Sequence, residues 1–564
     1  MKRWVAFTGI LIFGIAAVVV SERRKVDVQA SPAALLYLVA DTEQELTRMP
    51  VSFTRMSDID EIRAGDELAQ SYATDNDSHK APETAEVEQY MTRVGSQLAS
   101  RAHRKLPYKF HYIPSPYLIN AFALPGGHVY VGAGLLSLMD SEDELAAVIG
   151  HEIEHVDHYH CAERLQLEQA LRKIPLGGLM GLPIEVFEAG YSKDQEMEAD
   201  REGTRLAVAS GYSPNGAIRM FEAFDELHKE YQAKAKSPQQ EVTDVALETV
   251  EGYFRSHPLP SERISQIQKM IAEEQWPTRP ERDLAVAYIF LTERAQNALE
   301  EQKYSQAEHL ANMSLHLRPE QAKALEVLAR AQFAQANFSA AAGSYRKILD
   351  LGTSKGELVN GYALSLAASN RATANEEFAQ WKESAKGDKP REVDVATAGL
   401  NLLSGRPEFA EKLEQQLANS DDAQEPVWIG ELGWWHYLAG DYQRASELLW
   451  EAVQQRPGNT QISLRMAWVR IDQKRYADAL QLLETISYDA DQQPERAMAR
   501  AVTQWQAQEK EDAFRYFEIA IRGQSTWAKP QWVEALYSRT VVQSIEQMQT
   551  EAEARPKRAT VAGR

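Results

Sequence analysis

The strongest chemical signal in the sequence is a pair of histidines four residues apart, His151 and His155, which enclose Glu152. On a helix, residues at this spacing share one face, with Cβ atoms about 5–6 Å apart. Two imidazoles so placed can take two corners of a zinc tetrahedron, and the carboxylate of Glu152 can act as general base on a water molecule. The alternative is a surface helix with two solvated histidines. The apolar run at 145–149 before the pair favours a helix embedded in a domain.

A catalytic zinc site takes a third protein ligand and keeps one position open. Candidates lie downstream, where Glu196 and Asp200 are four residues apart and therefore share a helical face. One carboxylate can bind the metal, while the other can accept the spare N–H of a ligating histidine and orient its ring. Taken alone, such an acidic cluster is usually a solvated face, but the histidine pair upstream favours the metal site.

A small sheet and several helices are predicted around these residues. Ser141, three residues before Glu144, forms a capping box that begins a helix expected over 141–172. A loop rich in Gly and Pro is expected at 174–192, followed by further helices to about residue 275. Two short segments show the side-chain alternation typical of strands and are flanked by Pro and Gly. These predicted strands are Tyr108–Ile113 and Gly127–Val131.

Small residues recur with a period of 34 in the Ala- and Leu-rich stretch 282–545. This period resembles the tetratricopeptide repeat, in which small residues lie where paired helices cross. Five units are readable, and the middle, 352–425, is expected to be helical but degenerate. Such an array presents a concave groove that commonly holds an extended peptide or another protein. The repeating positions are Ala307 and Ala341, then Ala445, Ala479 and Ala513, with Ala329, Gly433, Ala467 and Ala501 each twelve residues before one of them.

The two ends of the sequence are predicted to lie outside these domains. Met1-Lys2-Arg3 precedes an apolar run over 4–20, a pattern that the export machinery reads. That run is at the lower limit for spanning a bilayer, so both a cleaved signal peptide and an uncleaved anchor within 1–30 stay open. Residues 31–57 are expected to be a linker with a short helix, and 546–564 a flexible tail. Export predicts a periplasmic location.

Composition excludes several classes of protein. The chain has 564 residues, of which 44% are hydrophobic, with a formal net charge of −21. These values exclude a wholly disordered chain and a polytopic membrane protein. Because an acidic body repels a phosphate backbone, nucleic acid is not expected as a partner. Cys161 is the single cysteine, so no intrachain disulfide forms, and we expect a buried, inert thiol.

Several motifs in order resemble the HtpX-like and CAAX-prenyl-protease-like zinc metalloendopeptidases over about 58–270. The resemblance implies a mostly α protein, with a zincin-type α+β protease domain at 58–275 followed by an α-solenoid at 282–545. The soluble envelope branch of that family couples such a domain to tetratricopeptide repeats. The motifs are Asn120–Gly127, the strand His128–Val131, Glu144-Leu145-Ala146, the histidine pair, and Glu196–Asp200.

The resemblance implies one Zn²⁺ bound by His151, His155 and Glu196, with Glu152 as general base and Asp200 supporting a ligand. It implies an edge strand beside the cleft, to which substrate adds, near Asn120, Gly126 and Gly127. A segment with His257 and Arg263 is a regulatory candidate, in which His257 acts as a reversible plug or belongs to a capped turn. Three residues depart from the family pattern and leave the cleft shape open: Glu154, Tyr159 and Lys193. His158 and His160 are expected to pack near the ligands or support them.

The resemblance and the repeats together predict a zinc-dependent endopeptidase of the bacterial cell envelope. Its expected substrates are misfolded or unassembled envelope proteins recruited through the repeats, and its expected partners are envelope or outer-membrane assembly proteins. An alternative is a chaperone or assembly adaptor whose repeats bind clients while the protease site is slow or latent. A third, metal-free scaffold is a weaker alternative.

Overall fold

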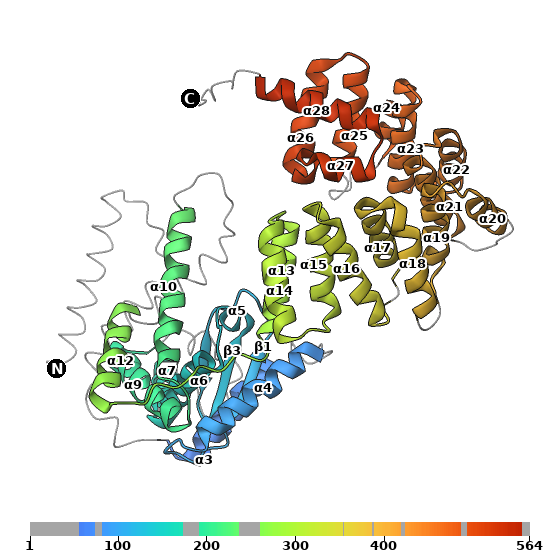
Figure 1. Ribbon diagram of the computed structural model, residues 1–564. Coiled ribbons are helices and arrows are strands. Elements are labelled where there is room, and N and C mark those ends of the chain that lie inside the picture. Colours follow the sequence, from blue (N-terminus) through green and yellow to red (C-terminus); the bar gives the residue numbers. More distant parts are fainter. Residues whose placement is uncertain are drawn as a thin grey trace, which may run out of the picture. The chain divides into compact units, whose positions relative to one another are not determined.

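The computed structural model describes residues 56–73, 82–172, 191–235, 260–353, 355–385, 389–418, 424–486 and 493–554 (Figure 1). They fall into two compact units, Met1–Leu284 and Ala285–Arg564. The expected signal or anchor lies outside the described residues, as do the linker and the Gly- and Pro-rich loop except for the last two residues of each. Among the described residues, no helix has the length and apolar character needed to cross a membrane.

The first unit contains a three-stranded sheet in the order β1-β3-β2. β1 (Lys109–Ile113) pairs in parallel with β3 (His128–Gly132), and β2 (Ala121–Leu124) pairs antiparallel with β3. The predictions of β1 and β3 are confirmed. β2 was missed because its four residues are all apolar and buried, so the sequence shows no alternation there.

Eight helices accompany the sheet in the described part of this unit. The helical prediction for 141–172 is confirmed for most of the stretch, but the chain forms two helices that are separated at Tyr159. Tyr159 has a φ of 65°, which a right-handed helix does not accommodate. The helices are α3 (Asp58–Ala73), α4 (Pro82–Ala99), α5 (Ala133–Leu136), α6 (Glu142–Asp157), α7 (His160–Arg172), α9 (Lys193–Ala209), α10 (Asn215–Ala235) and α12 (Pro260–Glu274).

The second unit consists of helix pairs that follow one another around an arc (Figure 1). This confirms the expected mostly α fold with an α-solenoid, and the degenerate stretch 352–425 contributes α17 to α20. The pairs are α13 (Ala287–Glu300) with α14 (Tyr304–Leu317), α15 (Ala322–Ala334) with α16 (Phe338–Asp350), α17 (Gly356–Ser369) with α18 (Arg371–Ser384), α19 (Arg391–Leu403) with α20 (Glu408–Leu417), α21 (Glu425–Leu438) with α22 (Tyr442–Gln455), α23 (Thr460–Asp472) with α24 (Tyr476–Thr485), and α25 (Gln493–Gln506) with α26 (Lys510–Gly523).

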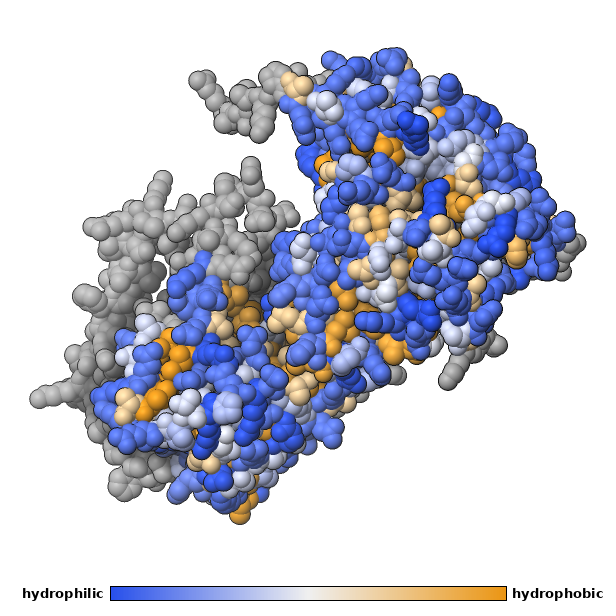
Figure 2. Space-filling model, in the orientation of Figure 1, coloured by the Kyte–Doolittle hydropathy of each residue, from blue (hydrophilic) through white to orange (hydrophobic). Residues whose placement is uncertain are grey.

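The small residues that recur every 34 positions lie at the helix crossings. Ala307, Ala341, Ala445 and Ala479 are fully buried. A Cβ atom added at Gly433 would lie 2.9 Å from the Leu449 side chain, so the crossing of α21 and α22 has no room for a larger residue. The face shown in Figure 2 is mostly hydrophilic over these helices, with hydrophobic patches between them.

After the last helix pair, a segment of this unit lies against the first helices of several pairs. This inner segment, residues 523–538, contains η4 (Ser525–Ala528) and α27 (Pro530–Leu536), and α28 (Arg539–Ala554) follows it. The tail predicted from residue 546 is therefore wrong for 546–554, because α28 continues through these residues and buries Met548.

The inner segment bridges early and late helix pairs. The side chain of Gln302 donates to the Gly523 carbonyl at 2.5 Å and accepts from the Ser525 amide at 2.6 Å. Nζ of Lys529 donates to the Ala334 carbonyl at 3.0 Å. Near the other end of the segment, the Tyr437 hydroxyl accepts from the amide of Ser538 at 3.1 Å. Part of the expected groove is thus occupied, and a cavity of about 720 Å³ lies between α27 and the ends of α15, α17, α19 and α21.

Candidate metal centre

The site is built where α6 and α9 cross with their backbones in contact. A Cβ atom added at Gly203 would lie 2.7 Å from the His151 amide nitrogen, and one added at Gly150 would lie 2.9 Å from the Gly203 carbonyl oxygen. Any side chain at either glycine would push the two helices apart. Because the helices approach so closely, Glu196 on α9 reaches the histidines on α6. Ser141 begins α6 by accepting a hydrogen bond from the Glu144 amide, which is one half of the predicted capping box; the Glu144 carboxylate accepts from the Asp140 amide.

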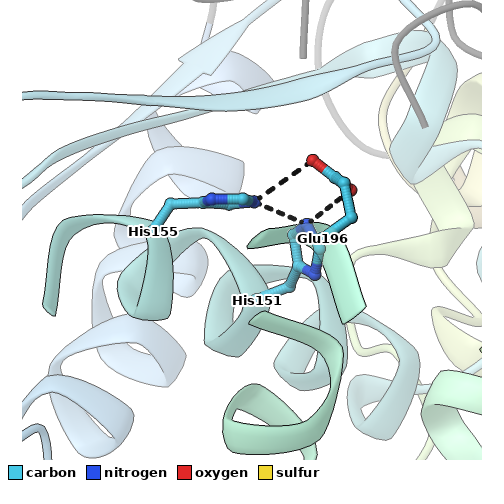
Figure 3. A group of neighbouring side chains, drawn as sticks. All are labelled: His151, His155 and Glu196. Carbon is cyan, nitrogen blue, oxygen red and sulfur yellow. Dashed lines mark hydrogen bonds and ion pairs between the residues drawn. The ribbon is translucent and has the colours of Figure 1, made fainter. Parts of the chain in front are cut away.

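The two histidines and Glu196 converge on one point (Figure 3). The Nε2 atoms of His151 and His155 are 3.0 Å apart. Glu196 lies with Oε2 3.5 Å from His151 Nε2 and Oε1 3.5 Å from His155 Nε2. One ligand atom from each of the three residues lies within 4.8 Å of the other two. This geometry allows all three side chains to bind a single ion.

The chemistry of this donor set fits a zinc ion. Two imidazole nitrogens and one carboxylate oxygen are the ligands of many catalytic zinc sites, which leave a fourth position open. The side chains of His155 and Glu196 are fully buried, where charged and polar groups require partners. Among the described residues, this is the single group of three or more such side chains with a metal-binding arrangement.

Glu152 is buried beside the donor set and lines a cavity of about 40 Å³ together with His151 and Asn120. Burial raises the pKa of Glu152 to about 7; the charge of Glu196 adds to this rise, while His151 opposes it. A carboxylate with a pKa near neutrality can both accept and return a proton at physiological pH. The position and environment of Glu152 therefore suit a general base.

Asp200, paired with Arg263, contacts His151 at Nδ1, the ring nitrogen that does not face His155 and Glu196. Oδ1 of Asp200 lies 2.9 Å from Nδ1 of His151. Arg263 donates to both carboxylate oxygens of Asp200, each at 2.6 Å, and stacks over the Phe221 ring at 4.2 Å. Burial raises the pKa of Asp200, but Arg263 outweighs it, and the net pKa is lowered. Arg263, a regulatory candidate by sequence, is thus bonded to the carboxylate beside a candidate ligand.

A second set of residues contacts His155. Nδ1 of His155 lies 3.0 Å from Nδ1 of His160, and the Tyr191 ring stacks on the His155 ring at 3.9 Å. Burial lowers the pKa of His160 to about 3. The sequence suggested a packing or supporting role for His160, whereas Tyr191 was missed, because it sits at the end of a Gly- and Pro-rich loop without any periodic pattern.

The edge of the sheet nearest the site is β2, and Asn120 immediately precedes it. Oδ1 of Asn120 accepts from the Ala121 amide at 3.0 Å. Gly126 and Gly127 form the turn between β2 and β3, with φ values of 79° and 102°. The strand that follows them is central rather than an edge. The expectation of an edge strand therefore applies to the strand after Asn120 and is wrong for the one after Gly127.

The three departures from the family pattern have structural partners. Glu154 is buried and lies 3.3 Å from Nε2 of His158, and Lys193 pairs with Glu262. The Tyr159 ring lies 3.7 Å below the Arg104 guanidinium. None of the three is among the residues that line the described cavity beside Glu152.

Cys161 is buried and donates to the Ala123 carbonyl at 3.5 Å, and burial raises the pKa of its thiol, as expected of an inert cysteine. His257 lies outside the described residues.

Comparisons with known proteins find matches for parts of this chain. Residues 83–271 match the model of peptidase family M48, and residues 436–502 match a tetratricopeptide repeat model. A putative beta-barrel assembly-enhancing protease of Vibrio cholerae is 32% identical over 201 residues, which are 32% of this chain and 38% of that protein.

Two further relatives share part of the chain. The beta-barrel assembly-enhancing protease of Escherichia coli strain K12 is 28% identical over 198 residues, 31% of this chain and 37% of that protein. The mitochondrial metalloendopeptidase OMA1 of Schizosaccharomyces pombe is 28% identical over 221 residues, 37% of this chain and 57% of that protein. The chain thus covers less than two thirds of each relative. Its residues 83–271 form a peptidase family M48 domain, and tetratricopeptide repeats follow that domain.

Proposed function

We propose that the protein is a zinc-dependent endopeptidase of the bacterial cell envelope that cleaves misfolded or unassembled envelope proteins. The convergence of His151, His155 and Glu196 on one point, with Glu152 beside them, carries this proposal. The export-like N-terminal pattern supports a periplasmic location. The names of two bacterial relatives refer to beta-barrel assembly and support outer-membrane proteins as clients.

The residues divide the reaction among them. A zinc ion bound by the two histidines and Glu196 would supply Lewis acidity at the scissile carbonyl. An oxygen of the Glu152 carboxylate takes a proton from the water that attacks this carbonyl, and the same group returns the proton to the leaving nitrogen. Oδ1 of Asp200, 2.9 Å from Nδ1 of His151, holds the ring hydrogen on Nδ1, which would leave the Nε2 lone pair free for a bound zinc ion.

Substrate is positioned by β2 and by the cavity beside Glu152. An extended peptide can add to β2 as a further strand, with backbone hydrogen bonds that do not depend on its sequence. The cavity of about 40 Å³ accepts a small side chain next to the scissile bond. Its apolar lining favours Ala or Val over charged residues at that position: Leu135, Val148, Ala217, Met220, Phe221 and Phe224.

The test compares cleavage of an unfolded labelled casein by three samples of the full chain: wild type, wild type treated with 1,10-phenanthroline, and Glu152→Gln. We expect loss of general-base catalysis to slow Glu152→Gln by about 10²–10⁴-fold. Glu154→Gln is the matched control, since this residue is buried on the same helix but lies away from the cavity. Equal cleavage by all three samples would refute the mechanism, and mapped cleavage sites test the preference for small apolar residues.

A second function, holding clients without cutting them, is favoured by the cavity of about 720 Å³ in the repeat unit. In this case Glu152→Gln would still bind unfolded protein and keep it from aggregating as well as the wild type does. Loss of that holding activity together with cleavage would argue against an independent chaperone function.

A further inference from the structure

The Nδ1 atoms of the two histidines in the candidate site contact different kinds of side chain. Nδ1 of His151 faces the carboxylate of Asp200, which is itself paired with Arg263. Nδ1 of His155 faces another imidazole, that of His160, at 3.0 Å. Nε2 of His160 in turn lies 3.4 Å from Oε2 of Glu198. The second chain of contacts therefore runs from Glu198 through His160 to His155.

The geometry assigns the protons along this second chain. Nε2 of His155 faces His151 and Glu196, so this nitrogen must offer its lone pair to an ion. A neutral imidazole then carries its hydrogen on Nδ1 and donates it to Nδ1 of His160. His160 must accept at Nδ1, which places its own hydrogen on Nε2, directed at the Glu198 carboxylate. Each ring nitrogen of His155 and His160 is thus either a donor or an acceptor, and every donor faces an acceptor.

The helix break at Tyr159 makes this contact available. On an uninterrupted helix, a residue five positions after His155 would be rotated by about 140° from it and would face elsewhere. The left-handed conformation of Tyr159 lies between α6 and α7 and turns the chain, so that His160 returns to the Nδ1 edge of the His155 ring. The Tyr159 ring lies against Arg104, and the preceding Asp157 accepts from the amides of His103 and Arg104 at 2.8 and 2.5 Å.

We propose that His160 is a positioning residue that fixes the tautomer and orientation of His155, and that Glu198 holds His160 in the required tautomer. This inference rests on the proposed function, because it assumes that His155 binds the metal. His160 does not serve as a further ligand of the same ion, since it contacts the nitrogen of His155 that faces away from His151 and Glu196. It is buried, with 4% of its surface exposed, so the contact is shielded from water.

The test measures zinc affinity of the full chain by competition with a fluorescent chelator. His160→Leu removes the acceptor, and we expect it to weaken zinc binding by about 10–100-fold, the usual effect of removing such a partner. His160→Gln keeps an acceptor oxygen and should recover most of the affinity. His158→Leu is the matched control, because His158 also approaches Glu198 but contacts Glu154 rather than a candidate ligand. The zinc affinity of this variant should stay within about twofold of wild type.

The visible absorption spectrum of the cobalt(II)-substituted chain gives a second readout, because it reports the orientation of the ligands rather than the overall fold. We expect a changed spectrum for His160→Leu and a wild-type spectrum for His158→Leu. Equal zinc affinity and an unchanged spectrum in folded His160→Leu would overturn the proposed role of His160. If wild type itself binds no zinc, the proposed function fails instead.

If His160→Leu does not fold, Glu198→Leu provides a second test. This variant keeps the His160 ring and removes the Glu198 carboxylate that contacts it. Weaker zinc binding than in the wild type supports the role of His160, and unchanged binding overturns it.

Discussion

The two units differ in what their helix crossings bury. Where α6 and α9 cross, the first unit buries two histidines and four carboxylates, which come from Glu152, Glu154, Glu196 and Asp200. The crossings in the second unit bury alanine and glycine instead, at positions that recur every 34 residues. The spacing of the charged groups therefore indicates a type of reaction. The spacing of the small residues indicates how the helices pack, but it does not indicate which ligand the repeats bind.

The two kinds of crossing also depend on different interactions. Buried charges are stable when each has a partner, and the loss of one partner is costly. Small residues permit close helix packing, and an added side chain there causes overpacking.

The largest effect is expected at the buried pair of Arg263 and Asp200. Arg263→Met leaves the Asp200 carboxylate without its cation, and we expect the free energy of unfolding of the first unit to fall by about 3–5 kcal/mol. The measurement is denaturant unfolding in the presence of a chelator, so that bound metal does not mask the loss. Arg263→Lys, which keeps a positive charge, should lose less. A loss below about 1 kcal/mol in Arg263→Met would show that this pairing does not stabilise the unit.

A smaller effect is expected at a helix crossing of the repeats. Ala479 is fully buried in α24, and Ala479→Leu should reduce the free energy of unfolding by about 1–3 kcal/mol through overpacking. Ala477→Leu is the matched control, because Ala477 is exposed on the same helix and should change stability by less than about 0.5 kcal/mol. If the two variants had equal stabilities, the recurring alanines would not be required for close packing.

The smallest effect is expected for Glu142→Gln at the start of α6, which should lower the free energy of unfolding by about 1 kcal/mol. The effect is small because the partner of Glu142, Arg93, is largely exposed. Burial raises the pKa of Glu142, but Arg93 and Tyr90 outweigh it, and the pKa lies below its usual value. The folded state therefore binds fewer protons than the unfolded state, so this contribution is present above the usual carboxyl range and disappears as the pH falls.

The measurement for Glu142 is the free energy of unfolding of wild type and Glu142→Gln as a function of pH. The difference between them should shrink toward acid pH. A difference that grows as the pH falls would mean that the sign of this pKa shift is wrong.

The sequence predicted the candidate site better than the elements around it. Because helical spacing alone places His151 beside His155 and Glu196 beside Asp200, the convergence of these residues required only that two helices meet. The close approach that brings the helices together depends on Gly150 and Gly203, and a single glycine in a sequence does not reveal its partner.

Other features could not be predicted because they depend on contacts between distant residues. Tyrosine seldom adopts a positive φ, so nothing in the composition around Tyr159 indicates that the predicted helix ends there. The inner segment contacts Gln302, more than two hundred residues earlier in the chain, and its residues carry no periodic pattern. β2 was hidden by its uniformly apolar sequence.

The most direct test of the account is the metal content of the full chain after dialysis against metal-free buffer, measured by elemental analysis. We predict about one zinc per chain for the wild type, and a large loss for a folded Glu196→Gln variant, because Glu196 completes the ligand set. Wild-type zinc content in Glu196→Gln, or no zinc in an active wild-type protease, would contradict the assignment of His151, His155 and Glu196 as a single metal site.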